Sequence, residues 1–185
     1  IKENHGKKII IGSKIKDKEN VQIVWSYGGY FNPKTGKKGM HGYKKMDSEK
    51  YNKIISVDWL TGMGTLVPSQ VVSDIGYWDD KHFPQYHGDS DFTYRAKIEG
   101  YEIIVFPDLV IHNYTKSSGI KHNNTLKGLI NLLSSTRSKS NFQKNLLFYK
   151  KYSTSPFAYF QLFKDYFRLI GGFFKWKIIN LFRNS

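Results

Sequence analysis

One stretch of this chain is crowded with carboxylates and contains Asp79, Asp80, Asp89 and Asp91. Asp89-Ser90-Asp91 comes before or at the start of a predicted helix, where the dipole and the free N–H groups stabilise negative charge. One interpretation is therefore structural. The other is that one carboxylate is a general base, which deprotonates a hydroxyl so that its oxygen attacks an electrophilic carbon. The Asp-x-Asp spacing alone leaves both interpretations open.

Two other places have side chains suited to chemistry. His112 follows a short apolar run; a single His there is usually a surface residue, although neutral imidazole also binds divalent cations. Asp58 and Trp59 come just before Gly62-Met63-Gly64, where glycine would allow a close approach of the backbone. Trp59 either packs in the core or offers its flat face to a sugar ring, whose hydroxyls could donate hydrogen bonds to Asp58.

Apolar runs and turn residues predict the elements that position these side chains. Strands are predicted at 8–13, 21–27, 54–60, 102–106 and 109–111, the last two separated at Pro107-Asp108. Residues 34–53, which are rich in Lys and Gly, are predicted to form a surface loop. Helices are predicted at 68–74, 90–99, 124–133, 141–152 and 157–182, the last interrupted at Gly171-Gly172. This order predicts an α/β fold with a mixed sheet and flanking helices.

The charge of the chain is concentrated at its C-terminal end. The 185 residues include 29 Lys and Arg and 15 Asp and Glu, a net charge of +14. Residues 1–114 hold 16 basic and 14 acidic side chains, and residues 115–185 hold 13 basic side chains and one acidic one, Asp165. This distribution argues against a polyanion-binding domain at the front. The absence of cysteine excludes a disulfide scaffold, a thiolate metal site and a Cys nucleophile.

The order of these pieces resembles a known enzyme family. The run VDWLTGMGTLVPSQVVSDIGYWDDKHFPQYHGDSDFTYRAKIEGYEIIVFPDLVIHNY (Val57 to Tyr114) is similar to the C-terminal half of the catalytic domain of family 2 glycosyltransferases, especially bacterial rhamnosyltransferase-like members. Upstream, KIIIGSKIKDKENVQIVWSYGGYFNPKTGKKG also resembles these enzymes, and so does SNFQKN at 140–145, with Lys144 in place of an Arg. The resemblance covers about residues 7–152.

The resemblance implies roles for particular residues. The family's Glu-Asp pair falls on Gly88-Asp89, so Asp89 is the candidate general base. Supporting roles are implied for Asp91 and Arg95. The acceptor-binding segment of the family falls on Asp58, Trp59 and Gly62, and the His that completes a metal shell in some members falls on His112.

The family resemblance also implies a fold and a cofactor. We expect residues 1–114 to be the acceptor-side half of a GT-A catalytic domain, 115–152 a helical segment that closes it, and 153–185 a basic, aromatic helical tail. A divalent metal, Mg or Mn, is expected in the full-length enzyme. Because the family's nucleotide-binding half is missing and the chain begins at Ile1 without Met, we expect a piece of a longer protein that is inactive by itself. Gly88 replaces the usual Glu, which removes a charge next to the base.

The implied reaction is an inverting transfer of a sugar from a nucleotide-sugar donor to a saccharide or lipid-linked acceptor, in the synthesis of cell-surface polysaccharide. Residues 153–185 hold ten aromatic side chains among basic ones and are predicted to be helical. This helix either packs on the domain or on a partner chain, or it lies on an anionic membrane surface near a lipid-linked acceptor. The family resemblance and the membrane interpretation of the tail together lead us to expect an enzyme in the cytoplasm, peripheral on the inner face of the cell membrane. The alternative is a non-enzymatic basic module that binds an anionic membrane or nucleic acid, and nucleic acid is the less favoured partner.

Overall fold

The computed structural model describes residues 8–114 and 125–183, with side chains as far as residue 179. The chain divides into two compact units. The first comprises residues 1–31, 38–81 and 88–118, and the second comprises residues 32–37, 82–87 and 119–185. The predicted helix start at Asn124, and the outer ends of the predicted segments at residues 1, 115 and 185, lie outside the described residues.

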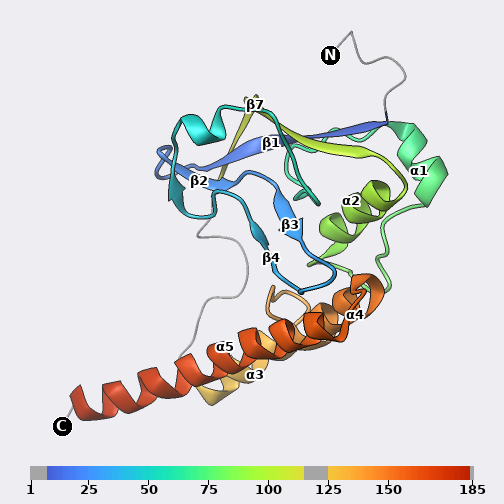
Figure 1. The fold of residues 1–185 in the computed structure, drawn as a ribbon. Coiled ribbons are helices and arrows are strands. Elements are labelled where there is room, and N and C mark those ends of the chain that lie inside the picture. Colours follow the sequence, from blue (N-terminus) through green and yellow to red (C-terminus); the bar gives the residue numbers. More distant parts are fainter. Residues whose placement is uncertain (1–7, 115–124, 184–185) are drawn as a thin grey trace. The chain divides into compact units, whose positions relative to one another are not determined.

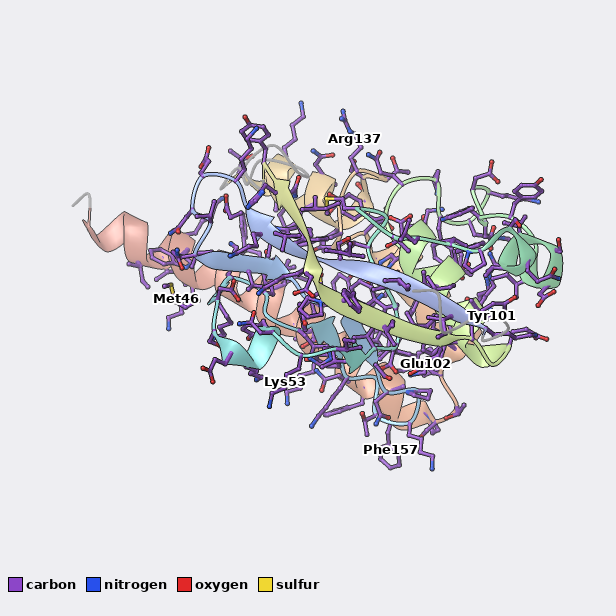
Figure 2. All side chains as sticks on the ribbon, turned by 90° about the horizontal axis from the view of Figure 1, so that it is seen from above. Met46, Lys53, Tyr101, Glu102, Arg137 and Phe157 are labelled. Carbon is purple, nitrogen blue, oxygen red and sulfur yellow. The ribbon has the colours of Figure 1, made fainter. Side chains whose placement is uncertain are left out.

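The first unit is a mixed five-stranded sheet with flanking helices, so the predicted α/β class is confirmed (Figure 1). The strand order is β5-β2-β1-β7-β6. β1 and β7 are parallel neighbours, and the other pairs in the sheet are antiparallel. The strand bounds are β1 Ile9–Asp17, β2 Ile23–Ser26, β5 Lys45–Met46, β6 Ile55–Ser56 and β7 Glu102–Asn113. Figure 2 labels Tyr101 and Glu102 at the start of β7 and Met46 at the end of β5.

β7 runs without a break through Pro107, so the prediction of two separate strands at 102–106 and 109–111 was wrong. The register with β1 shifts there, from Ser13 opposite Phe106 to Lys14 opposite Val110. Residues 107–109 therefore form a bulge. Because Pro107 lies in this bulge, its missing N–H removes no hydrogen bond from the ladder.

The predicted loop at 34–53 contains three short elements, so that prediction was also wrong in part. β4 (Lys38–Met40) pairs with β3 (Gly29–Phe31) in a separate two-stranded sheet, and β5 and the 3-10 helix η2 (Glu49–Tyr51) follow. Strands of two or three residues are too short to show an alternating apolar pattern, which is why the sequence did not reveal them. The strand predicted at 54–60 shortens to β6, and Val57 and Trp59 follow as single hydrogen-bonded positions.

Two helices complete the first unit. α1 (Ser69–Ile75) begins after Pro68, and α2 (Gly88–Ile98) begins at the Asp89-Ser90-Asp91 triplet, both as predicted. α2 contacts β7 and buries Phe92, on which Trp78 stacks with its ring centroid at 3.8 Å. The core that holds sheet and helices together consists of Ile10, Val24, Tyr27, Tyr51, Val57, Leu60, Val71, Phe92, Ala96, Tyr101, Ile103 and Val105.

The second unit contains three helices, α3 (Leu126–Ser134), α4 (Phe142–Tyr152) and α5 (Pro156–Arg183). Thr125 and Asn141 cap α3 and α4, because their side-chain oxygens accept hydrogen bonds from the N–H groups of Gly128 and Lys144. α3 contacts α4, and α4 contacts α5. No helix within the described residues is long and apolar enough to cross a membrane.

α5 continues through Gly171-Gly172, so the predicted interruption there was wrong. Each glycine in a helix interior costs about 1 kcal/mol relative to alanine. The helix nevertheless persists because tertiary packing outweighs this propensity, with Leu162 buried before the glycines and Phe173 buried directly after them.

Candidate functional site

Asp89, Asp91 and Arg95 lie on α2 in the first unit, while Gly62 and Asp58 contact its residues Asp89 and Lys97. Asp91 is fully buried, and its Oδ2 accepts a hydrogen bond of 3.0 Å from Arg95 Nε, one turn further along α2. The other Arg95 nitrogens donate to the carbonyl oxygens of Ile75 and Tyr77, at 2.5 and 2.7 Å. The Asp91–Arg95 pair therefore fixes the chain that follows α1 against α2, which is a positioning task. Because the Asp91 carboxylate is buried, removing Arg95 would take a charged partner from a buried charge, which is costly.

Asp89 lies against the backbone of Gly62. A Cβ atom built on Gly62 would stand 2.6 Å from Asp89 Oδ2 and 2.7 Å from Oδ1, so glycine is needed for this approach. Thr93 also joins the start of α2 to the segment that leads to Gly62. Its hydroxyl donates a hydrogen bond to the Asp89 carbonyl oxygen at 2.7 Å and accepts one from Leu60 N–H at 2.9 Å. The close approach expected at Gly62 is thus present, and the group that approaches its backbone is the carboxylate of Asp89, the candidate base.

Asp58 uses both of its carboxylate oxygens inside the unit. Oδ2 accepts a hydrogen bond of 2.7 Å from Phe31 N–H, and Oδ1 forms an ion pair with Lys97. These contacts join β3, the segment after β6 and α2. A ligand hydroxyl would therefore meet an Asp58 side chain that already has partners on both oxygens.

Trp59 is only 8% exposed and packs against the backbone of Gly29. Its Nε1 donates a hydrogen bond of 3.2 Å to the Tyr30 carbonyl oxygen. This arrangement matches the core-packing interpretation. A role for Asp58, Trp59 and Gly62 in acceptor binding stays a prediction.

The Asp89 carboxylate differs from those of Asp58 and Asp91 in its hydrogen bonding. Within the described residues, no group donates a hydrogen bond to its carboxylate, and its side chain is half-buried rather than enclosed. A carboxylate that keeps its lone pairs and reaches solvent can accept a proton from a bound hydroxyl. The geometry therefore distinguishes one candidate base from its two engaged neighbours.

Lys38 is a residue of this site that the sequence did not reveal. It lies on β4 with its Nζ 5.9 Å from the centre of the Trp59 ring. Burial lowers the pKa of Lys38 to about 7, although the charge of Asp91 acts in the opposite direction. Lys38 belongs to a Lys-rich stretch without periodicity, so no local signal separated it from the exposed lysines around it.

His112 lies elsewhere in the unit. It is an exposed residue of β7, paired in register with Lys16 of β1. Among the described residues, no three His, Cys, Asp or Glu side chains come together in a group that could hold a metal ion. The described part of the chain thus does not offer a ligand set for the expected divalent metal, and the role of His112 stays a prediction.

No protein-family model matches this chain, and a comparison with curated proteins finds no significant match.

Proposed function

We propose that this chain is part of a glycosyltransferase that transfers a sugar from a nucleotide-sugar donor to a saccharide or lipid-linked acceptor. The observation that supports the proposal best is the hydrogen bonding of the Asp89 carboxylate. Its carboxylate lies at the start of α2 against Gly62 and accepts no hydrogen bond from any described residue, whereas the Asp58 and Asp91 carboxylates are engaged. The proposed reaction class is supported by the resemblance of the motif order to family 2 glycosyltransferases.

In the proposed reaction, Asp89 takes the proton of the acceptor hydroxyl as that oxygen forms a bond to the anomeric carbon of the donor. The bond from this carbon to the diphosphate oxygen breaks at the same time, and the nucleoside diphosphate leaves with the electron pair. The attack comes from the side opposite the leaving group, so the anomeric configuration is inverted. Thr93 and Gly62 act as positioning residues, because they fix the Asp89 backbone and leave room for its carboxylate.

The fold proposal is that the first unit is the acceptor-side part of a GT-A domain. The mixed sheet, with β1 and β7 parallel and α2 packed on β7, is compatible with this part of such a domain. The nucleotide-binding part would then have to come from another stretch of polypeptide.

The test uses the natural polypeptide that contains this sequence, supplied with a panel of nucleotide sugars and lipid-linked acceptors. Release of nucleoside diphosphate and formation of glycosylated acceptor are both measured. We expect Asp89→Asn to lower turnover by at least about 100-fold, because general-base catalysis contributes roughly that much. Donor binding, measured by calorimetry, should remain.

A matched control is Glu99→Gln, which makes the same carboxylate-to-amide change at the other end of α2, at an exposed position. We expect it to leave turnover unchanged. Wild-type turnover in Asp89→Asn would show that Asp89 is not the base. Failure of the natural polypeptide to bind or consume any nucleotide sugar would refute the glycosyltransferase proposal itself.

A further inference from the structure

One face of α5 is packed within the second unit. Ala158 and Leu162 are buried there, and Phe173 is buried beyond the two glycines. Tyr166 fixes the same side of the helix, since its hydroxyl donates to the Ser140 carbonyl oxygen at 2.9 Å and accepts from Asn145 at 3.0 Å. This face therefore has its partners inside the unit.

A second apolar stripe of α5 is more exposed, although the ring of Phe163 at its edge also contacts the Phe142 ring of α4, with the ring centroids 6.2 Å apart. It consists of Phe160, Phe163, Phe167, Phe174 and Ile178, each between 45% and 75% exposed. At about 100° per residue, the spacings of three, four, seven and four residues place these side chains within a sector of about 60°. We call them the aromatic stripe. It extends for about 27 Å at 1.5 Å per residue.

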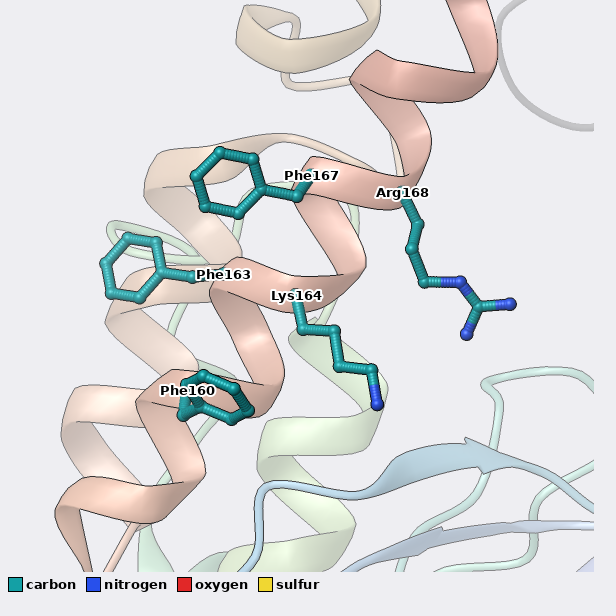
Figure 3. A pocket seen from close by; sticks show the side chains of 5 residues that line it. All are labelled: Phe160, Phe163, Lys164, Phe167 and Arg168. Carbon is teal, nitrogen blue, oxygen red and sulfur yellow. The ribbon is translucent and has the colours of Figure 1, made fainter.

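Basic side chains border the aromatic stripe. Lys164, Arg168 and Lys175 lie along one edge by the same helical arithmetic, and Lys177 lies along the other. In Figure 3, Phe163 and Phe167 point to one side of the helix while Lys164 and Arg168 extend from it in another direction. These five residues together line a shallow hollow on the helix surface. Asp165, the only acidic residue of α5, is held by Gln161 on the far side from the stripe.

We propose that the aromatic stripe binds the surface of a membrane that contains anionic lipids, with α5 lying in the plane of the interface. Phe side chains on such a helix enter the boundary between headgroups and acyl chains, while bordering Lys and Arg side chains reach the lipid phosphates. The helix is not apolar enough to span a bilayer. This proposal goes beyond sugar transfer and does not depend on it.

Charge complementarity selects this occupant over a second copy of the chain. Two copies that met along the aromatic stripe would bring basic edges together, because the edge with Lys164, Arg168 and Lys175 would face itself in an antiparallel pair and Lys177 in a parallel one. No acidic side chain of α5 lies on that face to offset the repulsion. An anionic lipid surface offers an apolar layer beneath a layer of negative charge. It therefore matches both the stripe and its borders.

The experiment measures sedimentation of the full chain with vesicles of phosphatidylcholine, with or without phosphatidylglycerol. We expect binding only when phosphatidylglycerol is present, and weaker binding at high salt. Phe167→Ser should lower the partition coefficient about tenfold, because a large apolar side chain no longer leaves water. Lys164→Gln should lower it about fivefold at low salt, which is the effect of one basic residue near an anionic surface.

The matched control is Trp176→Ser, since Trp176 is also an exposed aromatic residue of α5 but lies about opposite the aromatic stripe. It should leave the partition coefficient unchanged. Because all three side chains are exposed, circular dichroism and the melting temperature should not change in any variant.

Three results would overturn the proposal. The first is equal binding of wild type and Phe167→Ser to anionic vesicles. The second is a dimer in sedimentation velocity that Phe167→Ser dissociates, which would assign the stripe to a second copy. The third is stripe-dependent binding of an oligonucleotide with no binding to vesicles. None of them would affect the proposal for Asp89, which lies in the other unit.

Discussion

Gly62→Ala tests the contact between Gly62 and Asp89 most directly. Gly62 is exposed and is not among the glycines with a positive φ, so alanine is compatible with its backbone. The only new atom is a Cβ, which would meet the Asp89 carboxylate at 2.6 to 2.8 Å. The substitution therefore acts on one neighbour.

The size of the effect follows from this distance. An ordinary contact to a Cβ begins at about 3.4 Å, so the Asp89 carboxylate must move by roughly 0.8 Å. A half-buried carboxylate at the end of a side chain can move, and we expect a loss of unfolding free energy of about 1 kcal/mol, at the low end of the cost of overpacking. A displacement of this size at a catalytic group costs about 100-fold in rate.

Chemical denaturation and the turnover assay of the natural polypeptide measure these two effects separately. The double variant Gly62→Ala with Asp89→Ser supplies the control, because the shorter side chain leaves room for the Cβ. In the Asp89→Ser background, Gly62→Ala should cost almost no stability, which gives a coupling energy of about 1 kcal/mol. An equal cost in both backgrounds would refute the contact. Full turnover in Gly62→Ala would refute the requirement for this position of Asp89.

Two further predictions concern neighbouring residues. Because the folded-state pKa of Lys38 is about 7 and that of an unfolded lysine is about 10.5, the unfolded chain binds more protons between these values. Unfolding free energy should therefore rise by about 2–5 kcal/mol from pH 7 to pH 10.5 on account of Lys38. Denaturation curves of Lys38→Met should lack this rise, and an identical pH dependence in both proteins would contradict the lowered pKa. Gly29→Ala places a Cβ inside the space of the Trp59 ring and should destabilise the chain by about 3 kcal/mol in thermal unfolding. A cost below about 0.5 kcal/mol would contradict the packing of Trp59 on β3.

The sequence by itself determined the features that depend on neighbours along the chain. Apolar runs and capping residues placed β1, the start of α2 and the helix after Asn141 within a few residues of their observed bounds. The Asp-x-Asp at the head of α2 and the close approach at Gly62 were also readable, because helix ends and glycine have local physical requirements.

Only the tertiary structure decided the features that depend on distant partners. The carboxylates of Asp58 and Asp91 are engaged, whereas among the described residues none donates a hydrogen bond to that of Asp89. This difference arises from Phe31, Lys97 and Arg95, which folding brings to Asp58 and Asp91. The lowered pKa of Lys38 follows from burial that its sequence neighbours do not reveal. The continuity of β7 through Pro107 depends on a bulge in its pairing with β1.

The two apolar faces of α5 show the same difference between what the sequence reveals and what only the folded structure decides. Helical spacing shows from the sequence that aromatic residues occupy more than one side of this helix. It cannot show which side packs in the protein, because large apolar side chains occur on both sides. Leu162 and Phe173 are buried whereas Phe160 and Phe167 are exposed, and this difference is a property of the folded chain.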